Sequence, residues 1–385
     1  MGDVPMGGDH PVVVKTMTKT DTRDVEATLR QVREVAELGC DVIRIAAPDK
    51  EAAEALAPIV KGSPIPVVAD IHFDYRLALI ALESGVHGLR LNPGNIQDPG
   101  KVREVAIRAR QRGIRYLRIG VNAGSLPNDL KATMPIPEAM VAAAEREIAW
   151  LREAEFHDIC VSLKASNVLD TVAANREFAR RNDVPLHLGV TEAGLIREGT
   201  VKSSIGLGAL LLDGIGDAIR VSLTSDPHEE VRVGWEMLAA LGIRRRGVEI
   251  IACPTCGRLE IDLFAVAQQV KDRTMHIREP VVISVMGCVV NGPGEADLAD
   301  VGLAGGRGVG VLYDQGEAVR RVTQEEMVGE LVRLAEKEAA AMRDRAARGE
   351  PLRRRAVSAR DWVIPEGETQ EEGLAKLQEI KAGAA

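Results

Sequence analysis

Between residue 11 and about residue 245, short β-branched segments alternate with longer amphipathic segments, and this alternation limits the possible folds most strongly. The short segments have the composition of buried strands, and the longer ones carry apolar residues at helical spacing. The predicted strands are Val12–Lys15, Val42–Ala46, Pro66–Ile71, Gly88–Leu91, Tyr116–Val121, Ile159–Lys164, Pro185–Val190 and Ala218–Leu223. Eight strand–helix units in about 235 residues are typical of an α/β protein with a (β/α)₈ TIM barrel. An open doubly wound sheet is the rival fold, but no Gly-rich turn follows the first strand.

A different pattern begins after Arg246. Two predicted strands, Val248–Ile251 and Val281–Val285, each lead into a cysteine-containing loop, and a Gly-rich hairpin and the predicted helix Glu325–Arg345 follow. This pattern predicts a smaller α+β domain. We therefore expect a TIM-barrel substrate domain over residues 1–246, the smaller domain over residues 247–345, and a mobile charged tail over residues 346–385.

Composition excludes several classes of function. The net charge is −8 and aromatic residues make up 3% of the chain, which argues against nucleic-acid binding. No apolar stretch reaches the length of a membrane span, and the first ten residues do not resemble a signal peptide. The five cysteines are an odd number, unsuited to a disulfide framework, so we expect a cytoplasmic protein.

Polar residues gather at the carboxyl ends of the predicted strands, where TIM-barrel enzymes place their active sites. Because side chains alternate along a strand, Arg90 and Asn92 share one face, which we expect to point into the barrel mouth. The polar residues of these strand ends are Arg44, Asp70, His72, Arg90, Asn92, Arg118, Asn122, Lys164, Glu192, Arg220, Ser222 and Thr224.

Four arginines and Lys164 would then converge on one cavity, and within these strand-end motifs only Asp70 and Glu192 would face them as carboxylates. Burying so many cations without counter-charge is costly, which favours a polyanionic ligand with more than one phosphate. Individual arginines could instead form internal salt bridges with these carboxylates. His72 is either an acid–base group or a hydrogen-bonded structural residue, and Glu192 is either a proton donor or orienting group, or a neutraliser of nearby cations.

The smaller domain contains Cys253-x-x-Cys256 and, after 31 intervening residues, Cys288. A third cysteine in an equivalent loop argues against a thioredoxin-like dithiol, and the set lacks the fourth thiolate of a common zinc site. His276 could complete a zinc site, although it falls between the two loops. Three thiolates with an open fourth position suit a [4Fe–4S] cluster, and Glu295 is either its fourth ligand or an exposed loop residue. Cys40 and Cys160 are expected to be buried and inert.

Four motifs together resemble one enzyme family. They are Cys-Pro-Thr-Cys-Gly-Arg, Met-Gly-Cys-Val-Val-Asn-Gly-Pro-Gly-Glu, Leu-His-Leu-Gly-Val-Thr-Glu-Ala-Gly and Arg-Val-Ser-Leu-Thr. In combination they are similar to the 4-hydroxy-3-methylbut-2-enyl-diphosphate synthases of the methylerythritol phosphate route to isoprenoids. The resemblance covers about residues 5–340.

The resemblance implies reductive opening and dehydroxylation of 2-C-methyl-D-erythritol 2,4-cyclodiphosphate, with electrons from reduced flavodoxin or ferredoxin. It implies a [4Fe–4S] cluster on Cys253, Cys256 and Cys288 with Glu295 as exchangeable ligand, and an acidic residue, Glu192, near the substrate. It also implies a homodimer whose active site is shared between chains. The implied substrate-binding residues are Arg44, Arg90, Arg118, Asn122, Lys164, Arg220 and Ser222. The alternative is a non-redox phosphate-ligand barrel, a lyase or a binding protein, with a structural zinc module.

Overall fold

The structure is a computed structural model that describes residues 1–350. Within these residues the chain forms two compact units, which divide between Arg244 and Arg245. No helix in this part of the chain has the length and apolar character needed to cross a membrane.

Parallel strands form the sheet of the first unit, in the order β6-β5-β4-β3-β2-β1-β8-β7. Their bounds are β1 (Val13–Met17), β2 (Val42–Ala46), β3 (Val67–Asp70), β4 (Gly88–Leu91), β5 (Leu117–Asn122), β6 (Ile159–Lys164), β7 (His187–Leu188) and β8 (Ala218–Ile219). A parallel bridge between Val161 and Leu186 joins β6 to the segment that enters β7, so the sheet is nearly closed into a barrel. The predicted TIM barrel is thus confirmed.

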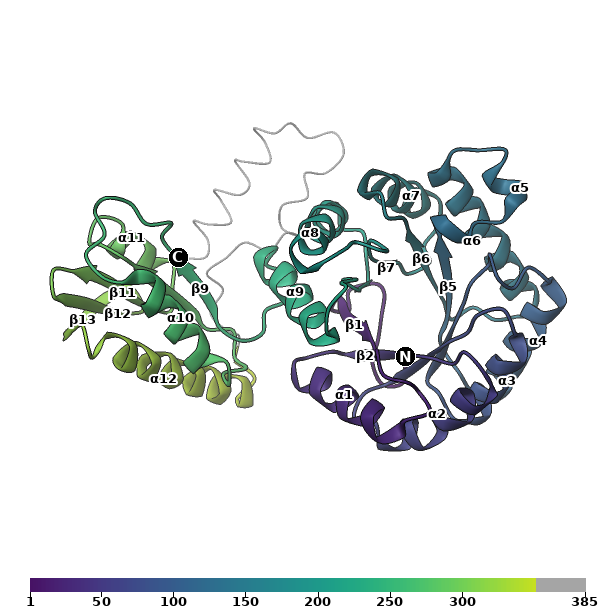
Figure 1. The fold of residues 1–385 in the computed structure, drawn as a ribbon, viewed down its shortest axis with the longest axis horizontal. Helices are drawn as coiled ribbons and strands as arrows, with labels where there is room; N and C mark the ends of the chain where they lie inside the picture. The colour runs from purple at the N-terminus through teal and green to yellow at the C-terminus, as the bar shows by residue number, and fades with distance from the viewer. Residues whose placement is uncertain (351–385) are drawn as a thin grey trace. The chain divides into compact units, whose positions relative to one another are not determined.

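Helices cover the outside of this barrel (Figure 1). Their bounds are α1 (Val25–Glu37), α2 (Lys50–Gly62), α3 (Tyr75–Glu83), α4 (Pro99–Gln111), η1 (Ala123–Ser125), α5 (Asn128–Lys131), α6 (Ile136–Glu153), α7 (Val168–Arg181), α8 (Ile196–Leu212) and α9 (Pro227–Ala240). Asp or Asn side chains cap several of them, as Asp49 does by accepting a hydrogen bond from the Ala52 amide. Such caps satisfy amides of the first turn and begin each helix just beyond the polar strand ends.

The last two barrel strands are shorter than predicted, with two residues each instead of six. Beyond Leu188 the regular ladder gives way to single hydrogen bonds, such as the one from the Arg220 amide to the Leu188 carbonyl. At Gly189 the backbone lies so close to Lys164 that an added Cβ would be 2.4 Å from its Nζ. The chain therefore departs from regular pairing where it makes room for this side chain.

The second unit contains a five-stranded sheet in the order β13-β12-β11-β10-β9, in which β9, β10 and β11 run parallel and β12 and β13 antiparallel. The bounds are β9 (Glu249–Ala252), α10 (Leu263–Thr274), β10 (Val282–Met286), α11 (Gly292–Asp297), β11 (Val301–Gly306), β12 (Val309–Asp314), β13 (Glu317–Thr323) and α12 (Met327–Ala347). A second hydrophobic core joins α10 and α12 to the sheet.

Two predictions for this unit need correction. Asn291-Gly-Pro-Gly294 has the composition of a turn, which the sequence predicts there, but it is the start of the short helix α11, in which Pro293 occupies the first turn, where the missing N–H costs nothing. Helix α12 continues to Ala347, so the first two residues of the predicted tail are helical. The predicted tail from residue 351 onward lies outside the described residues.

Candidate functional site

The structure brings the five predicted cations together inside the barrel. Arg44, Arg90, Arg118 and Lys164 lie on β2, β4, β5 and β6, and Arg220 directly follows β8. Neighbouring strands place them side by side, because the register pairs Asp70 with Arg90 and Arg90 with Arg118. Arg90, Arg118 and Lys164 are each at most 6% exposed.

Two strand glycines make room for these long side chains. A Cβ at Gly120 on β5 would lie 2.1 Å from the Nε of Arg90, whose Nη2 donates a hydrogen bond to the Gly120 carbonyl. A Cβ at Gly189 would clash in the same way with Lys164. The cations can therefore lie across the barrel interior only because these two positions lack side chains.

Asp70 is the acidic centre of one half of the mouth. It accepts a hydrogen bond from Arg90 Nη1 at 3.1 Å and forms an ion pair with Arg44 Nε at 3.5 Å. Burial alone would raise the pKa of Asp70, but the Arg44 and Arg90 guanidiniums hold it well below its usual value. Asp70 is therefore ionised and belongs to the cation network.

His72 is held between two partners. Arg90 Nη1 lies 2.8 Å from its Nε2, and the amide of Asn95 lies 2.8 Å from its Nδ1. Because arginine only donates, Nε2 must accept, which leaves the proton on Nδ1 and requires the amide oxygen of Asn95 to face it. His72 thus helps to hold Arg90 in place.

The residues of the neighbouring loops are partly engaged. Asn92 donates to Ser125 Oγ at 3.2 Å and accepts from the Gly94 amide, so it organises the loop after β4. Asn122 ends β5 directly opposite Lys164, and half-buried Ser222 lies two residues after Arg220.

The counter-charge is larger than the strand-end motifs alone indicate, because a carboxylate on a helix also faces the cations. Glu230 on α9 is fully buried and forms ion pairs with Arg220 at 3.4 Å and with Lys19 at 3.1 Å. It also accepts a 2.6 Å hydrogen bond from Thr16 Oγ1. The sequence does carry a signal for Glu230: it lies about one helical turn before Gly234, on the buried face of α9.

Glu192 itself is exposed and forms no ion pair with these cations among residues 1–350. Its backbone has a left-handed φ of 51°, which is uncommon for a residue other than glycine. Such conformations cluster at functional sites, where the surrounding structure imposes them.

Two further buried groups were missed by the sequence analysis. His187 on β7 lies 2.6 Å from Arg118 Nη1. Glu147 on α6 is buried, and neither of its oxygens has a hydrogen-bond partner among the described residues. Burial raises the pKa of Glu147 to about 8, so it is mostly protonated at neutral pH and supplies little counter-charge.

Cationic charge therefore exceeds the buried counter-charge. Asp70 and Glu230 neutralise part of it, but within residues 1–350 neither Arg118 nor Lys164 has an ion pair. Burial, followed by the repulsion of Arg118 and Arg220, holds the pKa of Lys164 well below its usual value. A bound polyanion would offset the repulsion between these cations and accept hydrogen bonds from the guanidinium groups.

The cysteine loops leave the same edge of the second sheet. Cys253 and Cys256 follow β9, Cys288 follows its parallel neighbour β10, and the Gly287 amide donates to Cys253 Sγ at 3.5 Å. Thr255, between the first two cysteines, has a left-handed φ of 64° that turns the loop. All three thiols are free, and Cys256 is exposed.

Within residues 1–350 no three His, Cys, Asp or Glu side chains are arranged closely enough to hold a metal ion. Glu295 is half-buried on α11, in the segment that follows Cys288. The donor set still fits an iron–sulfur group, because three free thiols lie on neighbouring loops and a backbone amide points at one sulfur. His276 is exposed and pairs with Glu336, so it is not held ready as a zinc ligand. Cys40 and Cys160 are buried in the barrel, as predicted.

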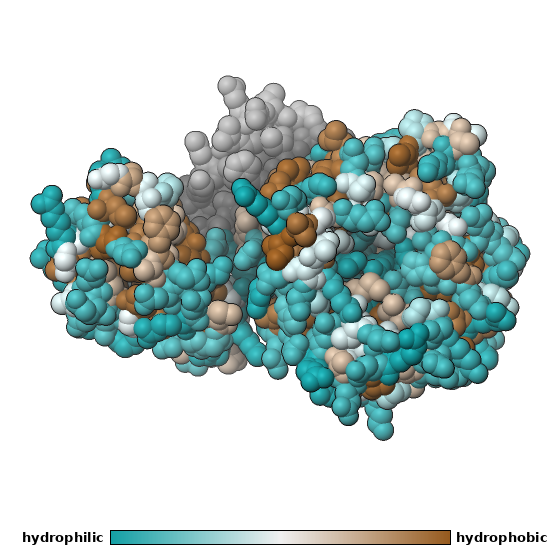
Figure 2. Space-filling model, viewed as in Figure 1, coloured by the Kyte–Doolittle hydropathy of each residue, from teal (hydrophilic) through white to brown (hydrophobic). Residues whose placement is uncertain are grey.

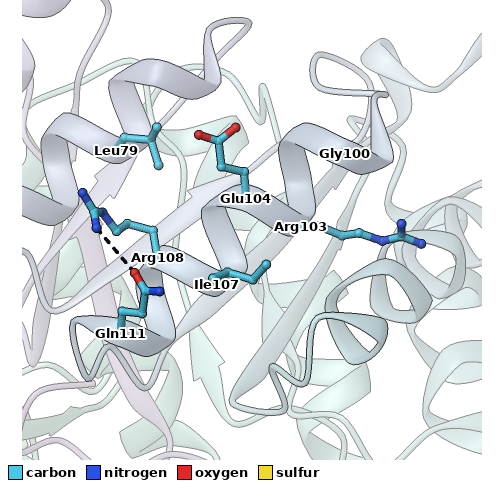
Figure 3. A pocket seen from close by; sticks show the side chains of 7 residues that line it. All are labelled: Leu79, Gly100, Arg103, Glu104, Ile107, Arg108 and Gln111. Carbon is cyan, nitrogen blue, oxygen red and sulfur yellow. Dashed lines mark hydrogen bonds between the residues drawn. The ribbon is translucent and has the colours of Figure 1, made fainter.

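A surface depression on the helix layer is separate from both sites (Figure 3). It lies between α3 and α4, and its lining includes Leu79, Ile107 and Arg108. Arg108 donates to Gln111 and forms an ion pair with Glu83, so its charge is already balanced. None of the predicted site residues lines it.

Comparison with known proteins agrees with this description. The family model described as the GcpE TIM-barrel domain matches residues 1–235, and the one described as the GcpE protein C-terminal domain matches residues 249–337. A relative from Symbiobacterium thermophilum is 54% identical over 342 residues, which cover 88% of this chain and 92% of the relative. A Geobacter sulfurreducens relative is 54% identical over 88% of this chain and 96% of its own length. One from Aquifex aeolicus is 51% identical over 86% and 94%.

All three relatives are named 4-hydroxy-3-methylbut-2-en-1-yl diphosphate synthase (flavodoxin). The family resemblance found in the sequence motifs is thereby confirmed. Because both family models and these relatives cover most of the chain, it belongs to the GcpE family of 4-hydroxy-3-methylbut-2-en-1-yl diphosphate synthases.

Proposed function

We propose that this enzyme converts 2-C-methyl-D-erythritol 2,4-cyclodiphosphate into (E)-4-hydroxy-3-methylbut-2-enyl diphosphate with electrons from reduced flavodoxin or ferredoxin. The observation that carries the proposal is the surplus of buried cations in the barrel mouth, together with the names of the relatives. In the reaction one carbon–oxygen bond to the diphosphate and one carbon–hydroxyl bond break. Two electrons and two protons are consumed, and one water is released.

The barrel side chains bind and orient the diphosphate in this proposal. Arg118 and Lys164, which have no carboxylate partner in the described chain, bind its oxygens directly, as guanidinium and ammonium groups commonly do. Arg44, Arg90 and Arg220 share their charge between the substrate and their carboxylates. Asn122 and Ser222 complete the set with uncharged hydrogen bonds.

Glu192 is the group that we propose for proton delivery or for orienting the substrate's hydroxyl. It is exposed at the end of the seventh strand segment, and its strained backbone fixes the direction in which its side chain leaves the chain. Asp70 and His72 have a supporting part in this scheme, because they hold Arg90 and Arg44 in place.

The second unit would hold a [4Fe–4S] cluster through Cys253, Cys256 and Cys288, with Glu295 as the exchangeable fourth ligand. When bound, such a cluster supplies electrons singly and offers an iron that accepts oxygen ligands. The adjacent loops and the amide of Gly287 support this assignment. The free thiols also support a reducing, cytoplasmic location.

We also propose a homodimer in which the active site is shared between chains. Its support is an apolar face on α8, where Val201, Ile205 and Leu212 are each about half exposed. Figure 2 shows apolar side chains gathered over this helix. An exposed apolar helix face of this kind commonly marks an association surface.

Anaerobic purification and assay test the proposal. We expect about four iron and four sulfide per chain, and turnover of the cyclodiphosphate with reduced flavodoxin. Arg118→Ala should weaken substrate binding about tenfold or more without loss of iron, because it removes a charged hydrogen-bond donor. Arg115→Ala, at an exposed position on the approach to the same strand, is the matched control. Stoichiometric zinc without iron, or unchanged binding by the Arg118 variant, would contradict the proposal.

A further inference from the structure

His187 lies inside the barrel, away from solvent. It is 1% exposed on β7, and its Nδ1 is 2.6 Å from Nη1 of Arg118 on β5. Strand β6 lies between β5 and β7, so this contact reaches past a whole strand across the barrel interior. The pair therefore ties the position of one cation to the next strand but one of the barrel.

The imidazole of His187 must be neutral in this contact. Arginine only donates hydrogen bonds, so Nδ1 accepts and the ring proton is on Nε2. Burial, followed by the positive charges of Lys164 and Arg118, holds the pKa of His187 well below its usual value. The histidine thus supplies an acceptor without supplying charge.

The other arginines of the mouth are held differently. Arg44 and Arg90 pair with Asp70, and Arg220 pairs with Glu230. Each carboxylate fixes a guanidinium and cancels part of its charge. Arg118 has no such partner among residues 1–350, and it is fixed by a neutral ring.

We propose that His187 is a positioning residue that fixes the Arg118 guanidinium in the barrel mouth and leaves its charge available for an anionic diphosphate. The inference rests on the proposed function, because it assumes that Arg118 binds the substrate. It assigns to His187 a requirement that a generic core residue would not have: the side chain must accept a hydrogen bond and must remain uncharged.

Three substitutions in the full-length enzyme separate these requirements. His187→Asn keeps an uncharged acceptor near the Nδ1 position. His187→Asp has the same shape as the Asn variant but adds a negative charge, and His187→Leu removes the acceptor. The exposed His157 provides the control, His157→Asn. The measurements are calorimetric binding of inorganic pyrophosphate, KM and kcat for the cyclodiphosphate, and thermal stability.

We expect His187→Asn to bind pyrophosphate within about threefold of the unmodified enzyme, and His187→Asp and His187→Leu to bind about tenfold or more weakly. The loss should fall on KM more than on kcat. His187→Asp should be at least as stable as His187→Asn, because it forms an ion pair with Arg118. A purely structural role would instead make binding follow stability through the series.

Equal binding by the Asn and Asp variants would overturn the inference, as would unchanged binding by the Leu variant. If the Leu variant fails to fold, the Asn–Asp comparison still decides, since the two side chains have the same shape. If the unmodified enzyme turns over the cyclodiphosphate but the His187 variants bind pyrophosphate as it does, the role of His187 alone is refuted. An unmodified enzyme that binds neither pyrophosphate nor the cyclodiphosphate would refute the proposed function together with this inference.

Discussion

Glu147 should make the stability of the barrel fall as pH rises. It lies on α6 with 1% of its surface exposed, and neither carboxyl oxygen has a hydrogen-bond partner among the described residues. Burial raises its pKa from 4.5 to about 8, although Arg90 and Arg146 act in the opposite direction. In the unfolded chain the same carboxyl ionises near its ordinary value.

The direction in which stability changes with pH follows from proton binding. Between pH 4.5 and 8 the folded chain retains a proton on Glu147 that the unfolded chain has lost, so raising the pH favours unfolding. The stability associated with this proton is complete below pH 4.5 and is lost as pH rises to about 8. At about 1.4 kcal/mol for each pKa unit, the loss between pH 5 and pH 8 is about 3 to 4 kcal/mol.

The assay compares Glu147→Gln with the unmodified chain by urea denaturation at several pH values. Trp150 and Trp235 both lie in the barrel, so a Trp362→Phe background confines the fluorescence signal to this unit. The variant should lose the fall in stability described above and should exceed the parent in stability at pH 8. Glu138→Gln, an exposed position on the same helix, should behave like the parent. Parallel curves for Glu147→Gln and the parent would refute the reasoning.

Other substitutions test the two sites separately. Cys288→Ser should abolish iron and sulfide binding under anaerobic conditions, whereas Cys160→Ser should retain both; iron content and the visible spectrum decide. Gly120→Ala should displace Arg90, because the added Cβ would lie 2.1 Å from its Nε, and pyrophosphate binding measured by calorimetry should fall about tenfold; unchanged binding would be the contrary result. Glu230→Gln should lower the free energy of unfolding by about 1–3 kcal/mol, because it weakens a buried charged contact; urea denaturation at pH 7 measures this loss, and an unchanged midpoint would count against it.

The barrel was predictable because its strands and helices have distinct periods in the sequence. Strands such as Val42–Ala46 are β-branched and buried, and they agree with the prediction residue for residue. The seventh and eighth strands were predicted too long, because apolar composition does not show where ladder pairing stops. The Asn291–Gly294 segment was misassigned for a related reason, since Pro and Gly suit both a turn and the first turn of a helix.

The site was predictable only where a single rule applied. Polar residues at strand ends led to the cations and to Asp70, because parallel strands bring those ends together. Glu230 and Glu147 lie on helices and enter the core from behind the sheet, where a search of strand ends does not find them. His187 did leave a signal, because it shares the inward face with Gly189 while Leu186 and Leu188 alternate with it on the other face.

These missed residues change how the charge of the mouth is understood. The five cations of the mouth, three of them buried and two partly buried, face Asp70 and Glu230 and have a formal surplus of three positive charges, even before Lys19 is counted. If Glu147 were ionised and His187 were an aspartate, most of this surplus would vanish without any ligand. The fold instead keeps one carboxyl protonated by burial and uses a neutral ring to hold an arginine. Both choices cost stability or demand tight packing, and both preserve positive charge where an anionic substrate can compensate it.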